Sequence, residues 1–166
     1  DIIWHKPNPM PESVRDRCTK SHEYLFLLSK NRKYYYDNEA IKEPVKQDWG
    51  TRNRDQGKYH NEGTGLQPHT GLTKSYTTKN KRSVWSITNK PYKGAHFAVF
   101  PPDLIEPCIL AGSERGDIIL DPFMGSGTTG MVAKKHGRNY IGCELHEDYA
   151  SLQTDRIDSV PQQLML

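Results

Sequence analysis

A glycine-rich stretch, residues 121–130 (DPFMGSGTTG), stands between a short apolar strand candidate and a helical stretch of this 166-residue chain. Glycines in such a turn let the backbone approach a ligand closely, and the helix that follows begins with N–H groups that have no partner within the helix. Asp121 lies at the carboxyl end of the predicted strand, and Glu144 ends the next one. Ligands of α/β folds bind at such strand ends, where a carboxylate can accept both hydroxyls of a ribose. The sequence therefore predicts a site for an adenosine-containing cofactor.

The same glycines fit other interpretations less well. Gly125, Gly127 and Gly130 spell G-x-G-x-x-G, a weak indication of a nicotinamide dinucleotide site when it stands alone. Asp121 would put a charge where such a site needs none, and few residues follow to build the other half of a dinucleotide fold. A P-loop is excluded because no Lys follows the second glycine. A turn without any ligand stays open, but it does not explain why Asp121 and Glu144 occur together.

The chain divides by composition and hydrophobic pattern into three regions, of which the first two are irregular. Residues 1–43 contain two strand candidates, 1–6 and 23–29, separated by a polar loop rich in proline. Residues 44–94 are poor in aliphatic side chains and contain one short strand candidate, 83–87.

The third region, residues 95–166, has the pattern of regular α/β structure. A helix is predicted from Asp103 to Ala111, with prolines at its start and Gly112 at its end. The elements that follow are a buried strand at 118–120, a helix at 128–135, a strand at 140–144 and a helix through Ile157. Because β and α elements alternate with short connections, we expect an α/β fold with a right-handed crossover in a parallel sheet.

Charge is concentrated in the middle region. Residues 44–94 hold ten Lys or Arg against three Asp or Glu, a net charge of +7, whereas the whole chain carries +3. A basic segment between acidic flanks is typical of an insert that binds a polyanion. A solvated loop whose lysines only maintain solubility has the same composition.

Composition excludes several classes of protein. No apolar run is long enough to cross a bilayer or to act as a signal peptide, so membrane and secretory interpretations are excluded. Cys18, Cys108 and Cys143 are far apart and show no C-x-x-C spacing, which indicates neither a metal site nor a disulfide framework and favours a reducing, cytoplasmic setting.

Three segments together resemble the DNA amino-methyltransferases that use S-adenosyl-L-methionine. The stretch GDIILDPFMGSGTTGMVAKKHGRNYIGCELHEDY, which ends at Tyr149, resembles their motifs I and II. HFAVFPP at residues 96–102, with Leu104, resembles their motif X, and IIWHKPNPMPESVRDRCTKSHEYLFLLSK resembles the two strands and loop after the catalytic motif. This order is that of the beta class. It implies a circularly permuted Rossmann-like methyltransferase fold, with an incomplete sheet in this chain and an irregular basic insert.

The resemblance implies roles for the residues that match motifs I and II. Asp121 would meet the methionine amino group, Glu144 would hold the ribose hydroxyls, and Phe123 would pack near the adenine or the methionine chain. Gly125 and Gly127 would shape the turn, and Thr128 would cap the helix or reach the cofactor carboxylate. His96 and Pro101 would form the motif X wall. A core position for Phe123, a simple N-cap role for Thr128 and a structural role for His96 stay open.

The resemblance also indicates what this sequence lacks. The catalytic tetrapeptide of the family, Asp-Pro-Pro-Tyr or Ser-Pro-Pro-Tyr, does not occur, and in the beta order it would precede Asp1. The strands that join the two halves of the sheet are missing as well, so we expect a C-terminal portion that is catalytically silent alone and assign no catalytic residue within it. A non-catalytic remnant that binds DNA or cofactor is the alternative, and a NAD-type enzyme is a remote one. A cytosine-C5 mechanism is disfavoured because no cysteine stands in a suitable place.

In this family the target base leaves the duplex, and its exocyclic amino group, adenine N6 or cytosine N4, takes the methyl group. The resemblance therefore implies that the partner is double-stranded DNA. It also implies three parts of the chain: residues 1–43 belong to the catalytic subdomain, residues 44–94 form the target-recognition insert, and residues 95–166 form the cofactor-binding subdomain. Candidate DNA contacts in the insert are Arg52, Arg54, Lys81 and Arg82. A homodimer and a cognate restriction endonuclease stay open, and no metal is expected.

Overall fold

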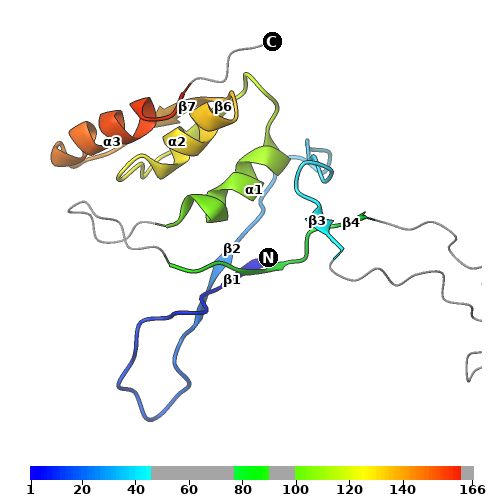
Figure 1. The fold of residues 1–166 in the computed structure, drawn as a ribbon, viewed down its shortest axis with the longest axis vertical. Coiled ribbons are helices and arrows are strands. Elements are labelled where there is room, and N and C mark those ends of the chain that lie inside the picture. The colour runs from blue at the N-terminus through cyan, green and yellow to red at the C-terminus, as the bar shows by residue number, and fades with distance from the viewer. Residues whose placement is uncertain (46–76, 90–99, 162–166) are drawn as a thin grey trace, which may run out of the picture. The chain divides into compact units, whose positions relative to one another are not determined.

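The structure, a computed structural model, describes residues 1–45, 77–89 and 100–161, which fall into two compact units (Figure 1). One unit comprises Asp1–Ile41 and Arg82–Leu166, and the other comprises Lys42–Lys81. The larger unit contains all the helices of the described residues.

A three-stranded sheet in the larger unit has the order β2-β1-β5, with β1 at Ile2–His5, β2 at His22–Leu25 and β5 at Val84–Ser86. β1 pairs antiparallel with β2 and parallel with β5, so that Trp4 lies opposite Trp85. The Nε1 atom of Trp4 donates a hydrogen bond of 2.8 Å to the backbone oxygen of Ile87, and that of Trp85 donates one of 2.7 Å to the backbone oxygen of Arg82. Both indole rings are therefore buried without leaving their donors unsatisfied.

Helix α1, Pro102–Gly112, packs against two sets of partners. Pro101 at its N-cap and proline at its first position fix the backbone for helix initiation. One side of the helix contributes Leu104 to a cluster with Trp4 and Trp85, and another contributes Ile109 to a cluster with α2. α1 thus connects the three-stranded sheet to the rest of the unit.

The second sheet has two parallel strands, β6 at Ile118–Asp121 and β7 at Asn139–Gly142, connected through α2 at Thr128–Lys135 and followed by α3 at Asp148–Asp158. Val132 and Ala133 of α2 are almost completely buried, and Ile119 of β6 packs against their cluster. Side chains alternate along a strand, so Ile118 and Leu120 point to the other face, where they are 61% and 64% exposed. The expected strand is therefore present but covered on one face only, and its other face is apolar and open in the described part of the chain.

An ion-pair cluster joins α1 to the end of α2. A carboxylate oxygen of Glu106 accepts hydrogen bonds from Lys135 Nζ at 2.8 Å and from His136 Nε2 at 2.6 Å. Partial burial opposes ionisation of this carboxyl, but the two hydrogen bonds and positive charges outweigh it, and the pKa of Glu106 lies below its ordinary value.

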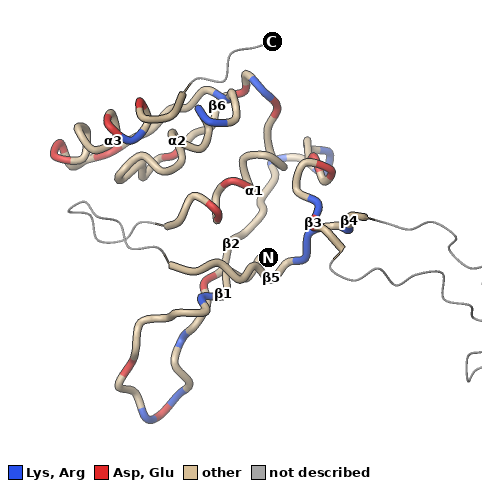
Figure 2. The backbone as a smooth tube through the Cα atoms, viewed as in Figure 1, with Lys and Arg blue, Asp and Glu red and all other residues tan. Residues whose placement is uncertain are grey.

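The smaller unit is described only at residues 42–45 and 77–81. Its two short strands, β3 at Glu43–Pro44 and β4 at Thr78–Lys79, pair antiparallel. The carboxylate of Glu43 lies 4.0 Å from Lys79 Nζ and 3.8 Å from Lys81 Nζ. Figure 2 shows Lys and Arg positions in blue beside β3 and β4. The expected insert, residues 44–94, overlaps this unit, but its strand candidate at 83–87 lies in the larger unit as β5.

The architecture is mixed α/β with partial sheets, which confirms the fold class expected from the sequence. The crossover β6-α2-β7 is parallel as predicted, and α2 has its predicted bounds. Among the described residues, no helix is both long and apolar enough to cross a membrane.

Candidate functional site

The carboxyl ends of β6 and β7 meet at the glycine-rich turn. Asp121 and Gly142 form the last residue pair of the two strands. Just beyond this pair, the backbone N–H of Cys143 donates to the backbone oxygen of Asp121 at 2.9 Å. The N–H of Met124 in turn donates to the Cys143 oxygen at 2.8 Å. These bonds extend the pairing past the strands and hold the turn against the segment that carries Glu144.

The carboxylate of Asp121 is fixed by two hydrogen bonds. Its Oδ1 atom accepts from the backbone N–H of Phe123 at 2.9 Å, and its Oδ2 atom accepts from the Thr129 hydroxyl at 2.5 Å. One donor comes from the turn and the other from the first turn of α2. Asp121 therefore presents a negative charge in a defined orientation beside the start of α2, where anions are stabilised.

The carboxylate of Glu144 is held in the same way by backbone donors. Its Oε2 atom accepts from the N–H of Gly125 at 2.7 Å, and its Oε1 atom accepts from the N–H of His146 at 2.9 Å. Glu144 is exposed, so its oxygens can also be reached from solution. Two ordered carboxylates at adjacent strand ends form an acceptor site for hydroxyl or ammonium donors.

The backbone of the turn requires glycine at two positions. Gly125 has a φ of 51° and Gly127 a φ of 81°, both in the left-handed region that other residues rarely adopt. Met124 is buried, and its side chain fills the space beside two further glycines, Gly130 and Gly142. A Cβ atom at Gly142 would lie within 3 Å of the Met124 side chain, so this methionine anchors the turn to both β7 and α2.

Residues next to the carboxylates expose large apolar side chains. Phe123 is 86% exposed, which excludes its alternative role as a core residue of this chain. Leu145, which the sequence analysis did not single out, is fully exposed directly after Glu144. An exposed apolar side chain beside each carboxylate is suited to contact the flat face of a ring.

The predicted role of Thr128 as a helix cap is wrong. Gly127 occupies the N-cap of α2 without a side-chain hydrogen bond, and Thr128, the first helical residue, is buried. The neighbouring Thr129 instead makes the side-chain contact, to Asp121. No signal in the sequence distinguishes two adjacent threonines here, because the choice depends on where the helix begins. Contact of Thr128 with a cofactor carboxylate stays a prediction.

The other predicted site residues are not brought to this turn by any described contact. Pro101 is buried at the N-cap of α1, where its oxygen accepts from the N–H of Leu104 at 3.0 Å. Lys81 pairs with Glu43 in the smaller unit, and the oxygen of Arg82 accepts from Trp85 in the larger one. The predictions for Arg52, Arg54 and His96 lie outside the described residues.

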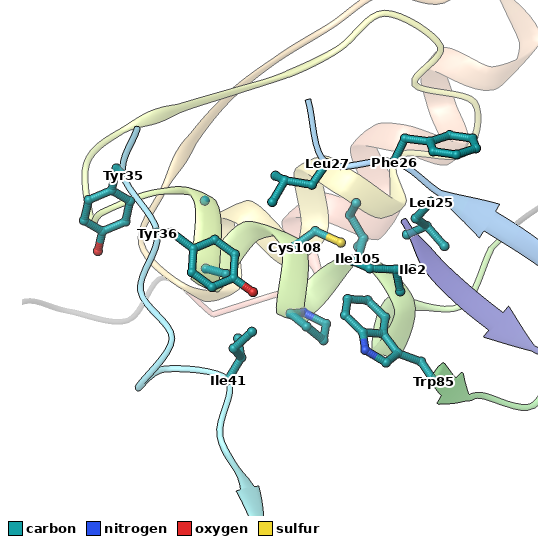
Figure 3. Close-up of a pocket in the computed structure, with 13 residues that line it drawn as sticks. Ile2, Leu25, Phe26, Leu27, Tyr35, Tyr36, Ile41, Trp85, Ile105 and Cys108 are labelled. Atoms are coloured by element: carbon teal, nitrogen blue, oxygen red, sulfur yellow. The ribbon is translucent and has the colours of Figure 1, made fainter. Parts of the chain in front are cut away.

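A separate apolar pocket of about 430 Å³ lies in the larger unit, between α1 and the chain that continues from β2 (Figure 3). Ile105 and Cys108 of α1 line it together with Ile2 and Leu25 of the three-stranded sheet, and Tyr36 closes one side. Neither carboxylate of the candidate site is part of its lining, so this pocket continues the apolar core and is not the candidate site. The described residues contain no group of three or more His, Cys, Asp or Glu side chains that could hold a metal ion.

Comparison with known proteins gives consistent matches over nearly the whole chain. The family model described as DNA methylase matches residues 1–155. The Type II methyltransferase M.SmaI of Serratia marcescens is 49% identical over 157 residues, which cover 95% of this chain and 45% of that protein. The chain spans 43–45% of the length of the first three curated relatives that it matches.

Solved structures give the same result for the fold. The complex of M1.HpyAVI with SAM is 26% identical with a TM-score of 0.59, covering 93% of this chain and 59% of that one. The cytosine-N4-specific PvuII DNA methyltransferase is 19% identical with a TM-score of 0.66, covering 99% of this chain and 51% of that one. At that identity the second likeness concerns the fold alone.

Proposed function

The chain belongs to the DNA methylase family, and from that premise we propose that it serves the transfer of a methyl group from S-adenosyl-L-methionine to an exocyclic amino group of DNA, adenine N6 or cytosine N4. The observation that carries this proposal is the pair of carboxylates, Asp121 and Glu144, that hydrogen bonds hold at the carboxyl ends of two adjacent parallel strands.

The residues at these strand ends fit this cofactor chemically. S-adenosylmethionine carries an ammonium group, two ribose hydroxyls and an adenine ring. Asp121 would accept from the ammonium group, Glu144 from the ribose hydroxyls, and the exposed Phe123 would contact an apolar face of the ligand. Both carboxylates are ordered by donors within the chain, so little reorganisation is needed on binding. A relative solved with SAM, M1.HpyAVI, supports the same choice of ligand.

When bound, the cofactor supplies an electrophilic methyl group on a sulfonium centre. The residues of this chain would orient it by holding the methionine ammonium group at Asp121 and the ribose hydroxyls at Glu144. The glycine-rich turn between them would allow the backbone to lie close to the ligand. Gly125 and Gly127 adopt left-handed conformations that favour glycine, and glycine has no side chain to keep the ligand away.

Binding of DNA is the second part of the proposal. Residues 44–94, with a net charge of +7, would form the target-recognition insert, residues 1–43 part of the catalytic subdomain, and residues 95–166 the cofactor-binding subdomain. Arg52, Arg54, Lys81 and Arg82 are candidates for contacts with phosphates or base edges. The relatives come from bacteria and are named Type II methyltransferases, which supports a cytoplasmic protein and makes a cognate restriction endonuclease a reasonable partner to test.

Methyl transfer tests the proposal. Protein expressed from the intact reading frame is incubated with S-adenosylmethionine labelled in the methyl group and double-stranded DNA, and the DNA is digested to nucleosides. Label in N6-methyladenosine or N4-methylcytosine nucleosides supports the function and identifies the target base. The second candidate is a module that binds cofactor and DNA without turnover, which would use the same two carboxylates, Asp121 and Glu144. Cofactor binding without transfer would support that candidate, and absence of cofactor binding would overturn both.

A further inference from the structure

We propose that helix α3 positions the glycine-rich turn for the cofactor, with Gln153 and Arg156 as positioning residues. This inference rests on the proposed function, because it concerns the same site. It adds a role for α3, whose side chains bond a backbone oxygen and a hydroxyl group of the turn and do not contact the ligand itself.

Gln153 holds the peptide group that follows Gly125, and the peptide group before it is bonded to Glu144. Its Nε2 atom donates to the oxygen of Gly125 at 2.8 Å, and the bond is partly buried. The N–H of the same glycine donates to Glu144 Oε2 at 2.7 Å. Gly125 thus joins α3 to Glu144, because its carbonyl is held by the helix and its N–H holds the carboxylate.

Arg156 fixes the next residue of the turn. Its Nη1 atom donates to the hydroxyl oxygen of Ser126 at 2.8 Å. Ser126 is only 2% exposed, so its hydroxyl needs a partner within the protein. A charged donor gives a stronger hydrogen bond than a neutral one, and this bond holds Ser126 in the interior.

The two side chains belong to one face of α3 that packs closely on the turn. Gln153, Arg156 and Ile157 follow the i, i+3, i+4 spacing of a helix face. A Cβ atom added at Gly127 would lie 3.2 Å from the Cα of Gln153 and 3.3 Å from Cδ1 of Ile157. The backbone of the helix therefore lies directly against the turn, and its polar side chains reach the two residues just before Gly127.

Loss of these bonds would act on the cofactor through Glu144. Without the anchor from Gln153, the turn at Gly125 can shift away from α3, and the N–H of Gly125 then holds one oxygen of the Glu144 carboxylate less firmly. The ribose hydroxyls would then meet a mobile acceptor, and ordering it on binding costs affinity. The apolar contacts of Ile157 and Val132 remain, so the fold should persist.

The test measures binding of S-adenosylhomocysteine by calorimetry in the wild type and in variants that replace the polar end of the side chain by an unbranched apolar one. Q153M and R156M each remove one hydrogen bond, and each should weaken binding about 3- to 10-fold. Combining R156M with Ser126→Ala should weaken binding no more than R156M alone, because both changes break the same bond. R156K keeps a charged donor and should restore most of the affinity.

Asp158→Asn is the matched control. It breaks the 3.0 Å ion pair with Lys134, which also joins α2 to α3 but is exposed and does not touch the turn. Its affinity should equal that of the wild type, and thermal unfolding of every variant checks that the fold is intact.

Wild-type affinity in the folded Q153M and R156M variants would overturn the positioning role alone. Equal weakening in R156K and R156M, or in Asp158→Asn, would also overturn it, because the effect would then follow helix packing and not the bonds to the turn. Absence of binding by the wild type would overturn the proposed function and this inference with it.

Discussion

Replacement of Gly127 by Ala tests the geometry of the turn, because two independent costs act at this position. The φ of Gly127 is 81°, and an L-residue in that region costs about 1–2 kcal/mol. The added Cβ would also lie 3.2 Å from the Cα of Gln153, closer than the ordinary contact distance of about 3.5–4.0 Å. The atom it meets is backbone in the middle of α3, which cannot rotate away.

The expected loss of unfolding free energy is the sum of strain and overpacking. Overpacking of a close-packed site costs about 1–3 kcal/mol. Because a shift of α3 relieves part of both costs, we expect Gly127→Ala to lower stability by about 2–4 kcal/mol. The measurement is urea unfolding followed by circular dichroism, with the midpoint and slope compared with those of the wild type.

Two other glycines separate these costs. Gly116 has a φ of 88°, but a Cβ atom added there would meet nothing within 4 Å, so Gly116→Ala should lose only the strain, about 1–2 kcal/mol. Gly112 ends α1 with neither a positive φ nor a close neighbour, and Gly112→Ala should raise stability by up to about 1 kcal/mol. If Gly127→Ala is no less stable than Gly116→Ala, the close approach of α3 to the turn is refuted.

Three further predictions concern single side chains. Asp121→Asn should weaken binding of S-adenosylhomocysteine by about 1–3 kcal/mol, because it removes the charge that meets the ammonium group. Calorimetry at constant ionic strength measures this loss, and unchanged affinity would contradict the assigned role. Thr129→Val removes the donor that orients Asp121 and should weaken the same binding about 3- to 10-fold, while Thr129→Ser should retain it. The pKa of Glu106 is lowered in the folded protein, so its ionised form contributes stability above the ordinary pKa of glutamate, and this stability is lost as the pH falls through the lowered value. Urea unfolding between about pH 6 and pH 3 should therefore show a steeper loss of unfolding free energy for the wild type than for Glu106→Gln. Parallel pH profiles for these two proteins would contradict the assignment.

Local sequence patterns predict the elements around the site well. The bounds of α2 follow from the glycines before it and from Gly137 after it, and the run Ile118–Leu120 can be recognised as a strand from its composition. Asp121 and Glu144 are identifiable because strand ends and acidic residues coincide in the sequence. Their mutual placement then follows from the parallel pairing that a short β-α-β connection imposes.

Contacts between distant segments are not readable from these patterns. β5 pairs with β1 across about eighty residues, as the hydrogen bond between His5 and Ser86 illustrates, and the composition of residues 83–87 indicates a strand without indicating its neighbour. Gln153 and Arg156 lie 28 and 30 residues from the groups that they hold. On the sequence alone they are ordinary polar residues of an amphipathic helix.

Titration of S-adenosylhomocysteine into the protein, with NAD titrated in parallel, determines whether the β6–β7 turn binds the methyl donor or a dinucleotide. We expect saturable binding of S-adenosylhomocysteine at one site per chain, no binding of NAD, and a loss of about 1–3 kcal/mol in the binding free energy of Glu144→Gln, whose side chain keeps its size but not its charge. Absence of binding, preference for NAD, or undiminished affinity in Glu144→Gln would contradict the assignment of the β6–β7 turn as the cofactor site.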